Sequence, residues 1–176
     1  MRALVVYESM FGNTKEIAAA IADGLGESLP VDLVEVGSAP ATIPGDVGLL
    51  VVGGPTHAHG MTKPESRADS AKRAGDRLVS RGSGIREWLA ALHGGSSRVA
   101  AAAFDTRIKG PGLIWGSAAK GAAKSLRGLR FRVVAEPESF LVDGPTGPAF
   151  DRLVEGERER ARSWGRQLGA SLANRA

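Results

Sequence analysis

Cysteine is absent from this chain of 176 residues, which rules out disulfides, thiol catalysis and zinc or iron–sulfur sites held by cysteine. Only three histidines are present, so a structural metal site is not expected. No apolar run approaches the roughly 20 residues that a membrane-spanning helix needs. The first apolar strand begins at the N-terminus and leaves no room for a signal peptide. These absences predict a cytoplasmic protein without membrane insertion.

Positive charge is in modest excess, with a formal net charge of +4. Much of it lies in the segment 63–82, which carries six basic and three acidic residues. Aromatic residues are not interleaved with these basic residues, and no DNA-reading module is visible, so we expect no nucleic-acid partner. We interpret the segment as a solvated loop whose positive patch faces a partner protein, an acidic one by charge complementarity.

Apolar runs alternate with stretches of helical periodicity, as in a doubly wound α/β domain. The predicted strands are Arg2–Tyr7, Val31–Val36, Val47–Gly54, Arg98–Phe104 and Phe131–Ala135, the last interrupted at Glu136-Pro137 and resumed over Ser139–Val142. The predicted helices are Asn13–Gly26, Gly84–His93, Trp115–Leu126 and Ala149–Leu172. This order predicts one three-layer domain over residues 1–176, with five parallel strands, right-handed crossovers and a long irregular segment at 55–83.

A turn of small and polar residues, from Ser9 to Thr14, separates the first strand from the first helix. The first N–H groups of a helix lack partners within it and carry partial positive charge, and Gly12 lets the backbone approach a ligand closely. This combination predicts an anion site, most often for a phosphate. The turn lacks the lysine of a P-loop and the Gly-x-Gly-x-x-Gly of an NAD-binding unit. A turn that only caps the helix through Ser9 or Thr14 is the alternative interpretation.

The same turn resembles the phosphate loop of flavodoxins, a sequence of the type Ser/Thr-x-Ser/Thr-Gly-Asn-Thr. The residues that match are Ser9, Gly12, Asn13 and Thr14. Glu8 and Phe11 stand where hydroxyl residues are more usual. The resemblance implies a flavodoxin-like sheet of order 2-1-3-4-5, FMN as the cofactor and a redox partner protein.

In such a sheet, ligands bind at the carboxyl ends of the strands beside the switch point, here between the first and third strands. The loops Glu8–Thr14, Gly53–Met61 and Phe104–Pro111 should therefore converge. The second contains a Gly-Gly-Pro-Thr turn similar to the loop that wraps the flavin ring in flavodoxins and quinone reductases. The cofactor-binding residues that the resemblance implies are Ser9, Met10, Phe11, Gly12, Asn13, Thr14, Pro55, Thr56, His57, Ala58, His59, Gly60, Asp105, Thr106 and Arg107. No catalytic residue or metal ligand is predicted.

The tyrosine that flavodoxins commonly stack on the flavin is missing, because the only tyrosine, Tyr7, falls within the first strand. Trp115 is the aromatic residue nearest to the third loop. Loss of such a platform weakens flavin binding by about 1–3 kcal/mol. Arg107 and Lys109 make the third loop basic, and one positive charge at about 6 Å favours a reduced, anionic flavin by roughly 2–3 kcal/mol, on the order of 100 mV. We therefore predict a reduction potential less negative than that of acidic flavodoxins.

Three functions are compatible with these residues. The first is an FMN-binding electron carrier, because the redox chemistry belongs to the cofactor and the protein holds and tunes it. The second is an NAD(P)H-dependent flavin or quinone reductase-like enzyme, in which the long basic loop Thr62–Arg81 closes over the site or recruits an anionic substrate. The third is a flavin-free regulatory module of the same fold, which the missing tyrosine motivates.

Overall fold

The computed structural model describes residues 1–57, 59–110, 116–143 and 152–173. Its centre is a parallel sheet in the order β2-β1-β3-β5-β6. The strands along this path are β1 (Arg2–Tyr7), β2 (Val31–Glu35), β3 (Val47–His57), β5 (Ala100–Ile108) and β6 (Arg132–Val133). A further strand, β7 (Glu138–Val142), pairs in parallel with the second half of β5, while β6 pairs with its beginning. Together β6 and β7 form the interrupted fifth strand, so the predicted order 2-1-3-4-5 is confirmed.

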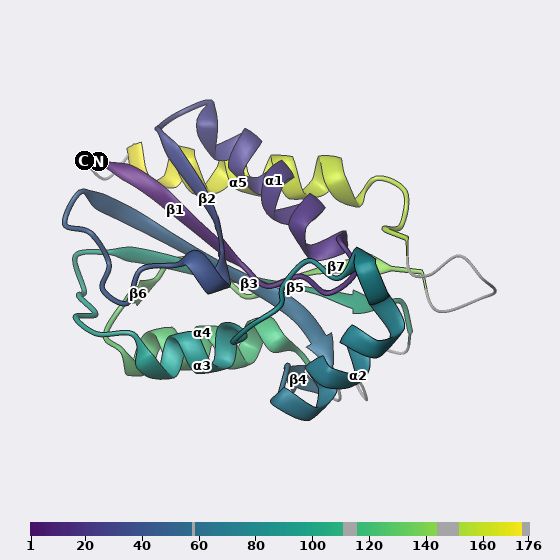
Figure 1. Cartoon of the computed structure of the whole chain (residues 1–176). Coiled ribbons are helices and arrows are strands. Elements are labelled where there is room, and N and C mark those ends of the chain that lie inside the picture. The colour runs from purple at the N-terminus through teal and green to yellow at the C-terminus, as the bar shows by residue number, and fades with distance from the viewer. Residues whose placement is uncertain (58, 111–115, 144–151, 174–176) are drawn as a thin grey trace.

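Helices cover both faces of the sheet (Figure 1). On one face lie α1 (Asn13–Gly26) and α5 (Glu157–Ala173), and on the other lie α3 (Ile85–Ala91) and α4 (Ala118–Gly128). Alternate residues of each strand serve the two cores: Val5 packs with the α1 and α5 side, and Val6 with the α3 and α4 side. Residues 49–52 of β3 are fully buried because both of their faces are covered, as expected for the central strand. In the edge strand β2, by contrast, Leu33 remains 38% exposed.

The segment 55–83, predicted to be irregular, contains the helix α2 (Pro64–Ala74), a 3-10 turn over Gly75–Arg77 and a two-residue strand, β4 (Gly60–Met61). That prediction was wrong because α2 buries only Ser70 and Ala74 and therefore shows no apolar periodicity. Proline at the first position of α2 is a helix-start signal that its sequence does carry. The strand β4 returns antiparallel to the end of β3, so a small hairpin extends the sheet here.

Two helices begin later than predicted. Ser117 is the N-cap of α4, and Gly116 before it has a φ of 61°, outside the helical region. Before α5, Gly156 has a φ of 86°. Residue 115 and residues 149–151, where the predicted helices would begin, lie outside the described residues.

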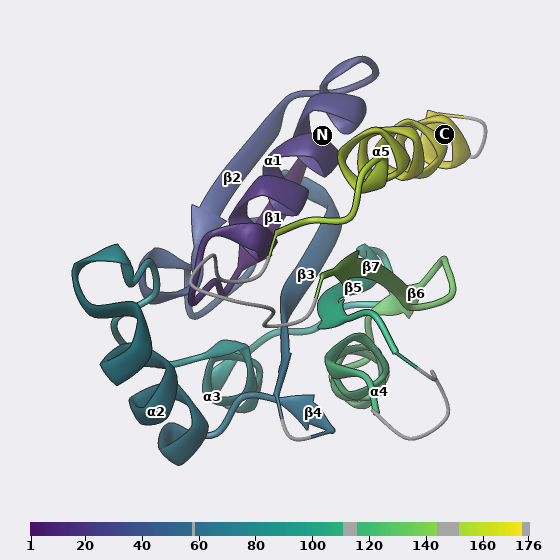
Figure 2. The ribbon, with the colours of Figure 1, turned by 90° about the vertical axis from the view of Figure 1, so that its right-hand side faces the viewer.

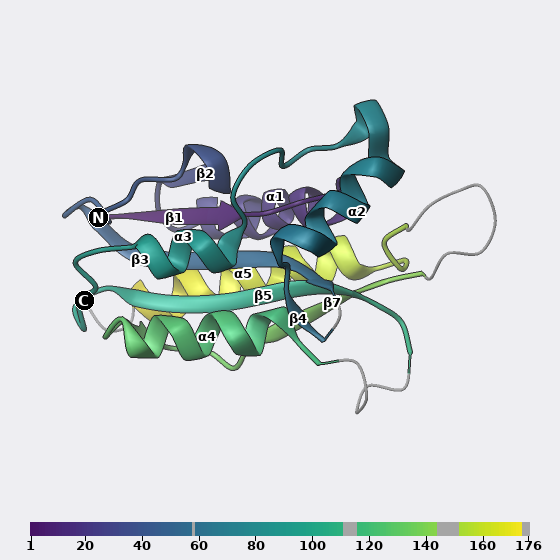
Figure 3. The same ribbon diagram turned by 60° about the horizontal axis from the view of Figure 1, so that its bottom comes forward.

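The carboxyl ends of β1, β3 and β5 lie at one end of the molecule together with α2 (Figure 2). The start of β1 and the last turn of α5 lie at the opposite end (Figure 3). Across the described ranges, no helix has both the length and the apolar composition to span a bilayer.

Candidate functional site

Two adjoining cavities open at the carboxyl ends of the central strands. The smaller one, of about 70 Å³, is lined by residues from all three loops that were predicted to converge. These are Ser9, Met10, Phe11, Asn13, Thr14, Pro55, Thr56, His57, Thr106, Arg107 and Ile108, together with Val142 of β7. The larger one, of about 620 Å³, shares with it Phe11, Thr56, His57, Arg107 and Ile108. The topology of the sheet thus brings three separate loops to one site.

The first loop forms the N-terminal end of α1. Gly12 adopts a φ of 102°, which glycine accepts without strain and which turns the chain into the helix. The buried hydroxyl of Ser9 accepts hydrogen bonds from the N–H of Gly12 at 3.2 Å and from the N–H of Lys15 at 3.3 Å. Ser9 therefore holds the loop against the first turn of α1, and the N-terminus of a helix carries the partial positive charge that favours an anion.

Thr14 fixes this loop to the third one. Its hydroxyl lies 2.7 Å from the hydroxyl of Thr106, and both side chains are buried. Both residues line the smaller cavity, so the two hydroxyls sit beside the first turn of α1. The prediction that the first and third loops meet is confirmed by this contact.

Glu8 departs from the hydroxyl pattern, and the structure shows where its side chain lies. It is 1% exposed and lines neither cavity. Its carboxylate accepts hydrogen bonds from the Thr62 hydroxyl at 2.6 Å and from the N–H of Ile85 at 2.8 Å. Burial raises the pKa of Glu8, although these two hydrogen bonds and the charge of Arg67 act in the opposite direction. Glu8 therefore ties the loop to the segment after β4 and to the start of α3.

The segment 62–83 is attached to the first loop at its far end as well. Ser80 donates its N–H to the carbonyl of Ser9 at 2.8 Å, and its hydroxyl accepts from the N–H of Ser9 at 3.0 Å. The N–H of Val79 donates to the carbonyl of Met10 at 3.2 Å. With both ends anchored in this way, α2 is held as a wall beside the loop.

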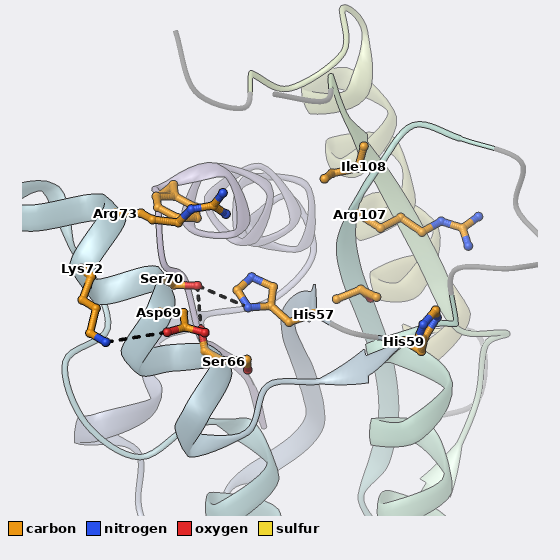
Figure 4. Close-up of a pocket in the computed structure, with 11 residues that line it drawn as sticks. His57, His59, Ser66, Asp69, Ser70, Lys72, Arg73, Arg107 and Ile108 are labelled. Carbon is orange, nitrogen blue, oxygen red and sulfur yellow. Dashed lines mark hydrogen bonds and ion pairs between the residues drawn. The ribbon is translucent and has the colours of Figure 1, made fainter. Parts of the chain in front are cut away.

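The larger cavity lies between α2 and the ends of β3 and β5 (Figure 4). The residues that α2 contributes are Ser66, Asp69, Ser70, Lys72 and Arg73. The Ser70 hydroxyl lies 3.4 Å from Nδ1 of His57, and Lys72 forms an ion pair with Asp69 at 3.9 Å. In Figure 4 the side chain of Arg73 points toward the cavity, whereas that of Arg107 extends away from α2.

The hairpin formed by β3 and β4 is seated against the start of α4. His59 has a φ of 74°, in the left-handed region that non-glycine residues rarely adopt. A Cβ atom on Gly116 would lie 2.0 Å from the carbonyl oxygen of His59, so only glycine permits this approach. The backbone of the second loop is therefore held close to the amino end of α4.

Asp105 is fully buried and lines neither cavity. Its Oδ2 accepts hydrogen bonds from the Ser117 hydroxyl at 2.6 Å, the N–H of Ala119 at 2.9 Å and the Thr56 hydroxyl at 3.0 Å. Its Oδ1 is buried and has no hydrogen-bond partner among the described residues. Asp105 thus connects the second loop to the N-terminus of α4, where a negative charge is favourable.

Of the residues that the sequence proposed for the cofactor, eleven line one or both cavities. Gly12, Gly60 and Asp105 do not, and Ala58 lies outside the described residues, as does Trp115. Tyr7 lies in β1 and is 7% exposed, as predicted, so it provides no stacking surface. The cavity residues that the sequence analysis did not propose come mainly from α2. The signals that could have indicated them are the basic character of α2 and its position directly after the second loop.

A family model described as Flavodoxin matches residues 5–135 of the sequence. The chain belongs to the flavodoxin family. Membership implies a flavin cofactor, and the strand order is that of the flavodoxin-like fold. No curated protein matches the sequence.

Solved flavodoxins share the fold of this family member. A flavodoxin from Archaea aligns with a TM-score of 0.63 and 19% identity over 98% of this chain and 99% of its own. A flavodoxin from Streptococcus pneumoniae TIGR4 aligns with a TM-score of 0.64 and 20% identity over 97% of this chain and 99% of its own. The rubredoxin oxygen:oxidoreductase from Desulfovibrio gigas aligns with a TM-score of 0.62 and 18% identity over 98% of this chain but only 36% of its own. At these identities the likeness establishes the fold alone.

Proposed function

We propose that this flavodoxin-family protein binds FMN and exchanges electrons with a partner protein. The observation that carries the proposal is the meeting of three loops at the switch point, where the N-terminus of α1 borders the cavity of about 70 Å³ and the cavity of about 620 Å³ adjoins it. Cavities of roughly 300–1,000 Å³ are typical of small-molecule sites. The two cavities adjoin, as a ligand with an anionic end and a planar ring requires.

The donors around the smaller cavity fit a phosphate. The hydroxyls of Ser9, Thr14 and Thr106 and the amides at the start of α1 would hold it, and none of the described residues that line this cavity is acidic. The buried Glu8 is engaged by Thr62 and Ile85 instead, so it does not point its charge at the anion. An acidic residue in this motif is therefore compatible with phosphate binding.

The larger cavity fits a ring. Phe11, His57 and Ile108 offer flat or apolar surface, and Thr56 is fixed by Asp105 at its floor. When bound, the flavin supplies one- and two-electron redox chemistry. The residues of this chain orient it, limit the access of water and place the positive charge of Arg107 near the cavity.

An FMN titration of the purified, flavin-free protein tests the proposal. We expect saturable quenching of flavin fluorescence with sub-micromolar affinity, and weaker binding of riboflavin, which lacks the phosphate. Ser9→Ala should weaken FMN binding and leave riboflavin binding almost unchanged. Ser97→Ala, at an exposed serine outside both cavities, is the matched control and should bind both ligands like the wild type. No FMN binding up to about 100 μM would contradict the proposal and favour a flavin-free module.

A reductase-like enzyme is the second candidate, and the wall formed by α2 favours it. This wall brings Lys72 and Arg73 to the cavity, where they could receive an anionic substrate. NAD(P)H-dependent reduction of a quinone by the FMN-loaded protein, with no partner added, would support this candidate. Its absence would favour the electron carrier. The cytoplasmic location remains a prediction.

A further inference from the structure

The exposed side of α4 carries a row of positive charges. Lys120, Lys124 and Arg127 follow one another at positions i, i+4 and i+7, so they lie along one side of the helix. All three are exposed, while the opposite side of α4 packs small residues and Leu126 on the sheet. At a rise of 1.5 Å per residue, the row extends over roughly 10 Å.

Two further cations, Arg130 and Arg132, follow α4 and are also exposed. We call the set Lys120, Lys124, Arg127, Arg130 and Arg132 the α4 cationic face. The sequence from 106 to 135 contains seven basic residues and no acidic one. No ion pair joins any residue of the α4 cationic face to a carboxylate within the described part of the chain.

The arginines on α5 behave differently. Arg158, Arg160, Arg162 and Arg166 each form an ion pair with a glutamate. In the segment 63–82, Arg67 pairs with Glu87 and Lys72 with Asp69, so part of that charge is also neutralised within the molecule. The charge of the α4 cationic face is available to another molecule.

Local helix energetics account for Arg127, which suits the helix dipole in the last turn of α4, but not for Lys120. Ser117 caps α4 and its hydroxyl accepts from the N–H of Lys120, which is the third residue of the helix. Glutamate at that position would complete a capping box and suit the helix dipole, whereas lysine does neither. Lys120 and Lys124 are like charges four residues apart, which destabilises a helix. Departures of this kind from local preference are expected where a surface serves binding.

We propose that the α4 cationic face docks an acidic electron-transfer protein. The inference rests on the proposed function, which requires a partner near the flavin. Lys120 lies in the first turn of α4, whose N-cap is hydrogen-bonded to Asp105 directly beneath the second loop. Lys120 therefore lies toward the end of the molecule that carries the cavities, and the rest of the face runs from there along α4 to Arg132 beside the start of β5.

The side chains of this face favour an acidic protein as the partner over an anionic membrane or a nucleic acid. The large apolar residues that are exposed among the described residues are Met1, Leu33 and Ile108, and none lies on α4, so the face has nothing to insert into a membrane. Phe131, the aromatic residue within the face's sequence, is 4% exposed and offers no platform for stacking bases. Ordered positive charge without apolar or aromatic groups suits the carboxylates of a protein surface, where it raises the association rate and fixes orientation.

The test uses a plant-type [2Fe–2S] ferredoxin as the acidic one-electron carrier and cytochrome c as a basic control protein. Binding to the flavin-free and FMN-loaded chain is measured by calorimetry at low and at high salt. One variant carries Lys124→Glu and Arg127→Glu. The matched control carries Lys63→Glu and Arg81→Glu, two exposed positions outside both cavities, and changes the net charge by the same amount.

We expect salt-sensitive binding of ferredoxin and none of cytochrome c. The α4 variant should weaken ferredoxin binding about tenfold or more, and the control variant by less than about threefold. With the FMN-loaded chain, electron transfer from reduced ferredoxin, which is oxidised as the flavin is reduced, should slow in parallel.

Absence of ferredoxin binding at low salt, or equal loss in the two double variants, would overturn the proposal. A greater loss in the control variant would place the docking site on the segment 62–83 instead. Tighter α4-dependent binding to single-stranded DNA, or to vesicles of anionic lipid, would also overturn it. Because the binding arm uses flavin-free protein, failure to bind FMN would contradict the proposed function without deciding this inference.

Discussion

Replacing Asp105 by alanine removes the acceptor that joins the second loop to α4. Three donors lose their partner at once: the Ser117 hydroxyl, the N–H of Ala119 and the Thr56 hydroxyl. The site is fully buried, so water cannot readily replace the carboxylate. The change therefore tests whether this hydrogen-bonded centre supports the floor of the site.

The expected loss follows from the number and kind of these bonds. A hydrogen bond to a charged group contributes about 1.5–3 kcal/mol net, but three bonds that share one oxygen are not additive. The variant also no longer has the free-energy cost of burying the carboxylate, whose Oδ1 has no hydrogen-bond partner among the described residues, and this offsets part of the loss. We expect Asp105→Ala to lower the free energy of unfolding by about 3 kcal/mol, which corresponds to a fall in Tm of roughly 6–12 °C for a domain of this size.

Urea denaturation of the flavin-free protein measures this quantity. Asp105→Asn keeps one acceptor oxygen and should lose about half as much as alanine. Ser117→Ala removes one donor together with the helix cap and should cost about 1 kcal/mol. The double variant should lose less than the sum of the two, because each change already breaks the shared bond. A loss below about 1 kcal/mol for Asp105→Ala, or strict additivity with Ser117→Ala, would refute the reasoning.

Three further changes test other parts of the structure. Burial raises the pKa of Glu8, so the stability that its protonation contributes is complete below the ordinary pKa of 4.5 and is lost as the pH rises through the higher folded-state pKa. Glu8→Gln should remove this pH dependence from urea midpoints measured between pH 4 and 7. A variant whose urea midpoints vary with pH as in the wild type would contradict this prediction. A Cβ on Gly84 would lie 2.6 Å from Oε2 of Glu8, so Gly84→Ala should destabilise the fold by about 1–3 kcal/mol, whereas Gly82→Ala, with open space around it, should not. Lys120→Glu should raise the free energy of unfolding of the unbound protein by about 0.5–1 kcal/mol, because it completes a capping box, and it should weaken ferredoxin binding. A lower free energy of unfolding would contradict the inference that Lys120 is unfavourable for α4.

The strands could be located because each is a short apolar run, and their order in the sheet followed from the alternation of strands and helices and from the resemblance to flavodoxins. The interruption at Glu136-Pro137 was also visible, since proline cannot donate to a sheet. The helix α2 could not be found in this way. Its contacts with the rest of the protein are made by small and polar residues such as Ser70, which carry no hydrophobic period.

The loops of the site were predictable because topology alone brings the ends of β1, β3 and β5 together. The direction of individual side chains was not. Glu8 follows β1, and Asp105 lies within β5, which runs to Ile108 and not to Phe104 as predicted; both turn into the protein and bind the starts of helices. Such choices depend on donors distant in sequence, Ile85 for Glu8 and Ala119 for Asp105, and the sequence does not reveal that they are near.

The start of β1 and the last turn of α5 lie at the end of the molecule away from the cavities (Figure 1). The first and last described elements of the chain therefore end on the side that faces neither the cavities nor α2. The chain can in consequence serve as a cassette within a longer protein, with its ligand entrance unobstructed. The same arrangement favours circular permutation, because the start of β1 and the last turn of α5 lie at one end of the molecule and new ends can open in the exposed turn at 97–98.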